Sequence, residues 1–184
     1  MDKREFLKTS GALVTGSLLS RYVHADPQSS TPRTNWAGNY TFHTNNLHQP
    51  ATIEEVQQVV KSCTKLRALG ARHSFNGIAD STENQISLKQ LNQIDLDTKS
   101  KTVTVGAGVT YGQLAPYIDS QGFAVHNLAS LPHVSVVGAT ATATHGSGSN
   151  NGNLSTAVSA IEFVAADGSI HHLSRAKDGD RVDH

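Results

Sequence analysis

The sequence holds little cysteine and no excess of positive or negative charge. Its 184 residues hold a single cysteine, Cys63, which excludes an intrachain disulfide. Cys63 falls on the apolar face of a predicted helix, so we expect a buried structural thiol. The 15 Lys and Arg residues are balanced by 15 Asp and Glu residues. Balanced charge offers no basic surface for nucleic acid, and we expect no nucleic-acid partner.

A long hydrophobic run is also missing. The best candidate, residues 11–19, is too short and too rich in Gly, Ser and Thr for a stable membrane span. It follows a basic start and precedes a Val-His-Ala cleavage site of the A-x-A kind at residues 23–25. This order predicts a secretory signal peptide over residues 1–25, with export to the periplasm or out of the cell. An amphipathic first helix is the alternative.

The export route is left open by the first basic residues. The Lys3-Arg4 start resembles a twin-arginine signal in which lysine replaces the first arginine. Twin-arginine export carries folded proteins with their cofactors, whereas a Sec signal would carry an unfolded chain. Both routes stay possible on the sequence alone.

Several catalytic signatures are absent as well. No Gly-x-x-x-x-Gly-Lys-Ser/Thr occurs, and no Gly-x-Gly-x-x-Gly lies between a strand and a helix, which disfavours P-loop and Rossmann sites. No Gly-x-Ser-x-Gly elbow supports a serine hydrolase. The chain has ten histidines, but His126, His133 and His145 are widely spaced, and His171-His172 would point to opposite faces of a strand. Without a His-x-x-x-His helix or an acidic cluster, we expect no metal site.

What the sequence does hold is a strand–helix–strand order that occurs twice. Thr52 and Glu55 form a capping-box pattern that opens a helix with apolar residues at helical spacing. A second helix is expected from Thr110, and Gly122 would stop it. Strands are expected near residues 40–42, 66–69, 86–88, 94–96, 102–105, 123–125, 157–166 and 169–173, the last two joined by a type I′ turn at Asp167-Gly168.

This order of elements indicates an α+β fold class. A Pro, Ser and Thr linker is expected over residues 26–34, followed by a folded part over residues 35–184. The repeated pattern predicts two small subdomains, of about residues 35–98 and 99–184.

The turn at residues 70–76 is the first candidate site. It runs Gly70, Ala71, Arg72, His73, Ser74, Phe75, Asn76. It follows a short apolar strand, and strand ends are where ligands meet α/β sheets. A neutral imidazole is a competent nucleophile, and Arg72 would favour the neutral form of His73 by repulsion of like charge. A histidine that is merely hydrogen-bonded in a turn is the alternative.

A stretch of small residues at 138–148 is the second candidate site. Every residue in it except His145 is small, so its backbone can approach a ligand closely. Its N–H groups could form an anion-binding nest for a pyrophosphate, and its threonine hydroxyls add donors. The alternative is a flexible loop. An apolar, proline-stiffened segment, flanked by Ser130 and Ser135, leads into this stretch.

Together these motifs resemble the bacterial alditol (xylitol) oxidases, flavoprotein oxidases of the vanillyl-alcohol oxidase type, with sugar-1,4-lactone oxidases as near relatives. The resemblance extends from about Asn35 to about Asp180. It is carried by Asn-Trp-Ala-Gly-Asn at 35–39, Arg-x-Leu-Gly-x-x-His-Ser-Phe-Asn at 67–76, Ser-Leu-Pro-His-x-Ser-x-x-Gly at 130–138, and Thr-x-Thr-His-Gly-Ser-Gly at 142–148.

The resemblance implies the FAD-binding domain of that type, two α+β subdomains that hold an extended FAD. It implies that His73 is the covalent anchor to the 8α carbon of the flavin and that Ser130 lies near the substrate. It also implies oxidation of a primary alcohol of a polyol by FAD and O2, giving an aldose and H2O2. The positions that the resemblance assigns to FAD are Gly70, Ala71, Arg72, His73, Ser74, Phe75, Asn76, Ser130, Ser135, Gly138, Thr142, Ala143, Thr144 and His145.

The chain departs from the family in two respects. Arg72 stands where many members have a second glycine, which tightens the steric demands of the turn. Relatives are over twice as long, so we expect a C-terminally incomplete domain that lacks most of the substrate pocket and is inactive alone. The alternatives are a lactone oxidase, a flavin-binding module without catalysis, and a periplasmic binding domain without flavin.

Overall fold

The computed structural model describes residues 32–183. The predicted signal peptide at 1–25 and most of the linker lie outside these residues. From Arg33 onward the chain forms one unit, and Arg33 and Thr34 already take part in it, because Phe42 N donates to Arg33 O at 2.8 Å and Thr34 forms an antiparallel bridge with Thr41. Among residues 32–183, no helix combines the length and the apolarity that crossing a membrane requires.

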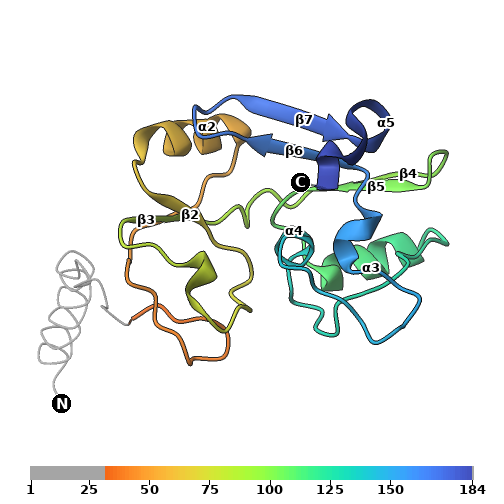
Figure 1. The fold of residues 1–184 in the computed structure, drawn as a ribbon, viewed down its shortest axis with the longest axis horizontal. Coiled ribbons are helices and arrows are strands. Elements are labelled where there is room, and N and C mark those ends of the chain that lie inside the picture. Colours follow the sequence, from red (N-terminus) through yellow and green to blue (C-terminus); the bar gives the residue numbers. More distant parts are fainter. Residues whose placement is uncertain (1–31, 184) are drawn as a thin grey trace, which may run out of the picture. The chain divides into compact units, whose positions relative to one another are not determined.

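A parallel three-stranded sheet forms the first part of the fold (Figure 1). Strands β1 (Leu47–His48) and β2 (Leu66–Ala68) both pair with β3 (Asn84–Ile86), which lies between them. Helix α2 (Ile53–Ser62) is the crossover from β1 to β2. The predicted strand–helix–strand unit is therefore confirmed, but its first strand lies later than the expected 40–42.

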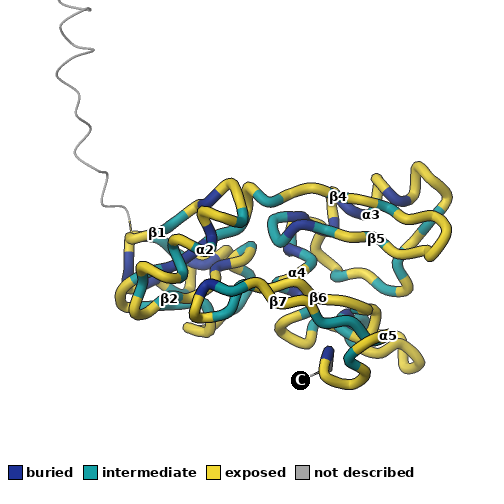
Figure 2. The backbone as a smooth tube through the Cα atoms, turned by 90° about the horizontal axis from the view of Figure 1, so that it is seen from above, coloured by how far each residue is buried: buried dark blue, intermediate teal, exposed yellow. Residues whose placement is uncertain are grey.

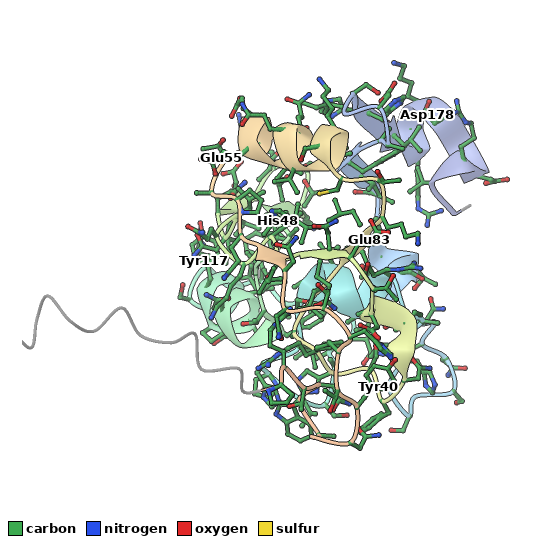
Figure 3. The ribbon with its side chains drawn as sticks, turned by 90° about the vertical axis from the view of Figure 1, so that its left-hand side faces the viewer. Tyr40, His48, Glu55, Glu83, Tyr117 and Asp178 are labelled. Carbon is green, nitrogen blue, oxygen red and sulfur yellow. The ribbon has the colours of Figure 1, made fainter. Side chains whose placement is uncertain are left out.

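Helix α2 begins as its capping box predicts. Thr52 Oγ1 accepts a hydrogen bond from Glu55 N at 3.2 Å, and the Glu55 carboxylate reaches back to Ala51 N at 2.7 Å. The helix buries Val56 and, on another side, holds the β6–β7 hairpin: Gln57 Nε2 donates to Gly168 O at 2.6 Å. Figure 3 labels Glu55, in the first turn of α2, and Tyr40, in the loop before β1.

Residues that follow the sheet in the chain build a hydrophobic core, here called the second core because it belongs to the second part of the fold. Strands β4 (Ile94–Asp97) and β5 (Thr102–Val105) lie where strands were expected, and they form an antiparallel pair. Helix α3 (Tyr111–Asp119) begins with Gln113 Oε1 accepting from Thr110 N at 2.9 Å, and Gly122 follows it at φ 80°. The core consists of Val109, Tyr111, Leu114, Ile118, Ala139 and Leu154.

The remaining elements are short. Helix α4 (Val136–Thr140) and the 3₁₀ turn η2 (Leu154–Ala157) each contribute one residue to the second core. Strands β6 (Ala160–Val164) and β7 (Ile170–Ser174) form an antiparallel hairpin, drawn mostly as exposed in Figure 2. Helix α5 (Arg175–Asp178) and the 3₁₀ segment η3 (Gly179–Asp183) follow, and a further 3₁₀ turn, η1 (Gly77–Ala79), precedes β3.

Three sequence-based expectations about elements are wrong. Residues 123–125 form no strand, because Phe123 N is used by Ile118 O at the end of α3. The hairpin turn is not type I′, which needs positive φ at both central residues: Gly168 has φ 79°, whereas Asp167 does not. Instead Gly168 N donates to Ala165 O at 2.8 Å, the pattern of a longer turn closed by a left-handed glycine. Cys63 follows α2 and is only half-buried.

A buried carboxylate ties the loop before β1 to the segment after the turn at 70–76. Asp80 accepts from Tyr40 Oη at 2.9 Å and from His43 N at 3.0 Å, and it pairs with the His43 ring. Its side chain is 7% exposed. Burial alone would raise the pKa of Asp80, but the hydrogen bonds from His43, Tyr40 and Ser81 outweigh burial and lower it to about 2.

We predict that Asp80→Ala destabilises the fold by about 2–3 kcal/mol, since the half-buried Tyr40 hydroxyl and the His43 N–H lose a charged acceptor. Because the pKa of Asp80 is lower in the folded state, its contribution is complete above the unfolded value and is lost as pH falls through about 4 toward 2. Urea unfolding at pH 7 and pH 3 measures both effects. The control Asp167→Ala removes an exposed carboxylate that serves Ser169, and an equal loss there would contradict the role given to burial.

Candidate functional site

The turn at residues 70–76 leaves the end of β2 and is held by the loop at 35–39. Trp36 N donates to Arg72 O at 2.8 Å. Asn35, which is 3% exposed, donates from Nδ2 to Ser74 O at 3.0 Å, and Asn39 Nδ2 donates to Phe75 O at 3.2 Å. Three carbonyl groups of the turn, at residues 72, 74 and 75, are thus bound by one preceding loop. The backbone around His73 is fixed before any ligand binds.

Arg72 adopts the conformation that a glycine would favour. Its φ is 65°, in the left-handed region, and its guanidinium Nη1 donates to Thr34 O at 3.2 Å on the surface. A side chain in this region costs roughly 1–2 kcal/mol. Arg72 therefore takes a conformation that costs stability and that a glycine would take without strain.

We predict that Arg72→Gly stabilises the fold by about 0.5 kcal/mol, because relief of the left-handed strain exceeds the extra freedom that glycine has when unfolded. Urea unfolding of the apoprotein measures the change. Lys101, at φ 55° in the β4–β5 turn, offers a matched Lys101→Gly control away from the site. A gain for the control with a loss for Arg72→Gly would show that the arginine side chain contributes more than its surface hydrogen bond suggests.

His73 lies in a cluster of three rings. Its ring centroid is 4.8 Å from that of Trp36 and 4.5 Å from that of His133, and the Trp36 and His133 centroids are 5.5 Å apart. Nε2 of His73 is buried and has no hydrogen-bond partner among the described residues. Desolvation, followed by repulsion from His133 and Arg72, lowers the pKa of His73. The imidazole is therefore neutral at pH 7, as expected from Arg72.

Ser135 joins the two predicted sites. It is 5% exposed and precedes α4. A Cβ at Gly138 would lie 2.5 Å from Ser135 Oγ, and a Cβ at Gly70 would lie 3.0 Å from the same atom. The absence of both side chains lets the start of the His73 turn meet the start of the small-residue stretch. Segments far apart in the sequence thus form one surface.

The small-residue stretch continues from α4 as a folded-back loop. Thr142 Oγ1 donates to Gly138 O at 2.9 Å, and Thr144 N donates to Ala139 O at 3.2 Å. Ala143 between them has φ 54°, and the Thr144 N–H bonds back to Ala139 O, so the left-handed residue ends α4 as in a Schellman C-cap. The exposed His145 ring contacts Gly146 O through Nδ1 at 2.9 Å.

Asn127 provides a second buried donor without a partner. Its Nδ2 is buried and unbonded among residues 32–183, while its Oδ1 accepts from Leu128 N at 2.9 Å. A Cβ at Gly146 would lie 3.0 Å from Asn127 Oδ1, so the amide packs directly on the small-residue stretch. Unpartnered polar atoms at both candidate segments, and glycines whose Cβ would fill the space beside Ser135, fit a polar ligand that the structure does not contain.

The predicted site residues are therefore not all equivalent. Gly70, His73, Ser135 and Gly138 are brought together, and Thr142, Ala143, Thr144 and His145 follow in one loop. Asn76 caps η1, with Ile78 N donating to its Oδ1 at 3.1 Å. Phe75 is 66% exposed, and Ser130 is exposed without a described partner. Ala71 and Ser74 contribute the backbone between these groups.

Sequence reasoning missed the neighbours of His73. Trp36 was a motif residue without a role, and His133 was considered only as a metal ligand. The available signal was that both belong to motifs of the same resemblance. Among the described residues, no three His, Cys, Asp or Glu side chains are grouped for a metal. A pocket of about 330 Å³ lies elsewhere, between residues 64–67 and 80–82.

Comparison with known proteins places this geometry in a family. The family model described as "FAD binding domain" matches residues 45–174, which is more than half of the chain. The matched range holds both the turn at 70–76 and the stretch at 138–148.

The chain is similar to several characterised oxidases. It is 47% identical over 144 residues to alditol oxidase from Streptomyces sp., covering 76% of this chain and 35% of that protein. It is 31% identical over 151 residues to L-gulonolactone oxidase from Mus musculus, covering 79% and 34%. Glucooligosaccharide oxidase from Acremonium strictum, described with a 6-S-cysteinyl, 8α-N1-histidyl FAD, superposes with a TM-score of 0.59 at 22% identity, covering 73% and 30%. The chain spans about a third of the length of these relatives.

Proposed function

Because the chain belongs to the FAD-binding domain family, we propose that it holds FAD across residues 70–76 and 135–145, as part of an oxidase that acts on alditols. The contact of Gly70 and Gly138 with Ser135 carries this proposal, since it joins the two segments into one surface. The vanillyl-alcohol oxidase type of fold and the FAD cofactor are as predicted from the sequence.

His73 is the proposed covalent anchor. Its backbone is immobilised, its imidazole is neutral, and Nδ1 is the nitrogen that burial of Nε2 leaves accessible. Attachment replaces one hydrogen of the flavin 8α methyl group by Nδ1. One hydrogen would come from the methyl group and one from the imidazole, and FAD, when bound, would supply the two-electron oxidation, with O2 taking up both hydrogens as H2O2. A glucooligosaccharide oxidase of the same fold is described with a histidyl FAD, which supports this assignment.

The small-residue stretch is proposed to bind the pyrophosphate. Gly138 leaves room beside Ser135, so the backbone at the start of the stretch can approach a ligand closely. The hydroxyls of Thr142 and Thr144 and the ring of His145 lie on the same loop. The negative charge of the pyrophosphate would then meet backbone dipoles rather than side-chain cations, in keeping with the balanced charge of the chain.

The reaction follows from the cofactor and the relatives. Bound FAD would accept a hydride from a primary alcohol of a polyol such as xylitol or sorbitol and pass the electrons to O2. Ser130, exposed at the start of the segment that leads to Ser135, is proposed to face the substrate. Identity to alditol oxidase is 47%, against 31% to a lactone oxidase, which favours an alditol over a sugar-1,4-lactone.

Two further parts of the proposal concern the N-terminal segment and the division of the folded part into subdomains. Residues 1–25 are proposed to direct export to the periplasm or out of the cell, by a twin-arginine-like or Sec signal. Residues 35–98 and 99–184 are proposed as two subdomains, with the parallel sheet in the first and β4–β5 at the start of the second. N-terminal sequencing of the secreted protein tests the cleavage before Asp26.

The cofactor is tested by incubating the chain with FAD, precipitating it with acid, and measuring flavin absorbance in the washed pellet. A yellow pellet supports the anchor, whereas a colourless pellet removes it. H2O2 release is then measured with xylitol and sorbitol against gulono- and galactono-lactone. Release with lactones only would favour the lactone oxidase, and retained flavin without any release would favour a binding module. If excess FAD leaves the melting temperature unmoved, the proposed function fails.

A further inference from the structure

We propose that Trp36 and His133 are positioning residues that hold the His73 ring in place for its attachment to the flavin. This inference rests on the proposed function, because it concerns how the chain prepares its anchor. It assigns roles to two side chains that neither the family match nor the names of the relatives assign.

The ring geometry is the first support. A histidine in a surface turn would normally sample several rotamers, because its two side-chain torsions are free. Here the centroids of three rings form a triangle with sides of 4.5, 4.8 and 5.5 Å, so each ring touches both others. A rotation of His73 about χ1 would carry the ring away from both partners, whereas a half-turn about χ2 would leave its centroid and plane in place. The cluster therefore fixes where the ring lies and the plane in which it lies.

The anchoring of the cluster is the second support. Trp36 N is bonded to Arg72 O, next to His73 in the chain, so the indole moves with the turn that it covers. His133 approaches from the other candidate segment, just before Ser135. Trp36 remains 53% exposed, which is unusual for a large aromatic ring and leaves a face free for a ligand. The selected rotamer thus lies where the two segments meet.

The consequence for His73 is that its two nitrogens differ. Nε2 is buried without a partner, and protonation there would place a positive charge among Trp36, His133 and Arg72. His133 and Arg72 are the charged groups that act on His73, and no carboxylate is among its determinants. Both desolvation by the rings and like charge therefore keep the imidazole neutral, with Nδ1 as its accessible nitrogen.

The test measures the anchor itself rather than enzyme activity. The rate of acid-stable flavin incorporation from added FAD is measured for Trp36→Ala, for His133→Ala and for the unaltered chain. Loss of orientation should slow incorporation on the order of 10- to 100-fold. Trp36→Phe and His133→Phe keep a ring in place and should restore most of the rate. Two-dimensional NMR of the histidine rings should show the His73 pKa rising in both alanine variants, as desolvation and repulsion are relieved.

The controls separate this inference from the proposed function. His171→Ala removes an exposed histidine from another ring pair, with Phe163, and should load FAD at the unchanged rate. If the unaltered chain takes up no FAD, the proposed function fails. If it loads normally and the Trp36→Ala and His133→Ala variants load equally fast with an unchanged His73 pKa, the inference is overturned while the function stands. If only unfolding is seen in the alanine variants, the phenylalanine variants decide by their rate and pKa.

Discussion

His73→Ala abolishes acid-stable flavin and leaves reversible FAD binding in place. The expectation follows from the separation of roles in the site. His73 supplies one atom, Nδ1, while the surface around Ser135 and the loop at 138–145 is made by other residues. Removing the imidazole therefore removes the bond but not the cradle. Flavin absorbance in the acid pellet falls to the background of untreated protein.

Reversible binding in the same variant is followed by fluorescence. Trp36 is the one tryptophan of the chain, and it lies 4.8 Å from the His73 ring, so its emission reports on this site alone. Bound flavin should quench it by energy transfer in both the unaltered chain and His73→Ala. His171→Ala, which changes an exposed ring in β7, serves as the matched control and should keep acid-stable flavin. Retention of pellet flavin by His73→Ala would move the anchor to another residue.

Gly106→Ala unfolds or severely destabilises the protein. A Cβ at Gly106 would lie 2.3 Å from Leu91 O, and Gly106 N donates to Gln93 O at 2.9 Å. The Leu91 carbonyl that the Cβ would overlap belongs to the backbone, so no side-chain rotation can relieve the overlap. Overpacking of this kind costs roughly 3 kcal/mol or more. Gly106 follows β5 and precedes the core residue Val109. A shift of the backbone at Gly106 would therefore disturb the packing of the second core.

A graded series tests this explanation by urea unfolding. Gly108→Ala should be as harmful, since its Cβ would lie 2.4 Å from Lys89 O. Gly122→Ala meets no atom within 4 Å but has φ 80°, and should cost only about 1 kcal/mol for its backbone conformation. Equal losses at all three positions would show that glycine flexibility, rather than the close carbonyl groups, decides stability here.

Local chemistry accounts for the features that were predicted correctly. The capping box at Thr52 and Glu55, the α3 start at Thr110 and the β4–β5 pair depend on residues a few positions apart. The strand at 123–125 was predicted wrongly because its apolar residues are used for packing against the second core, with Phe123 N bound to the end of α3. The type I′ turn was predicted wrongly because only glycine, and not Asp167, takes a positive φ.

The candidate site divides along the same line. The turn at 70–76 and the stretch at 138–148 were recognisable from residue types, since glycine, small residues and one histidine restrict what each segment can do. Their meeting at Ser135 was not, because the contact depends on where β2 ends relative to α4. Trp36 and His133 likewise carry no local signal of their proximity to His73, as each comes from a different loop.

The amino-acid sequence by itself determined that His73 sits in a glycine turn after a strand, that a small-residue stretch suits an anion, and that the chain resembles flavin-dependent oxidases. Only the tertiary structure decided which atoms of these segments meet. It joins Gly70 to Gly138 through Ser135, surrounds His73 with Trp36 and His133, and places Arg72 at φ 65°. The physical reason is that ring contacts, burial of Nε2 and the distance between two glycines arise from packing between distant segments, which no local pattern encodes.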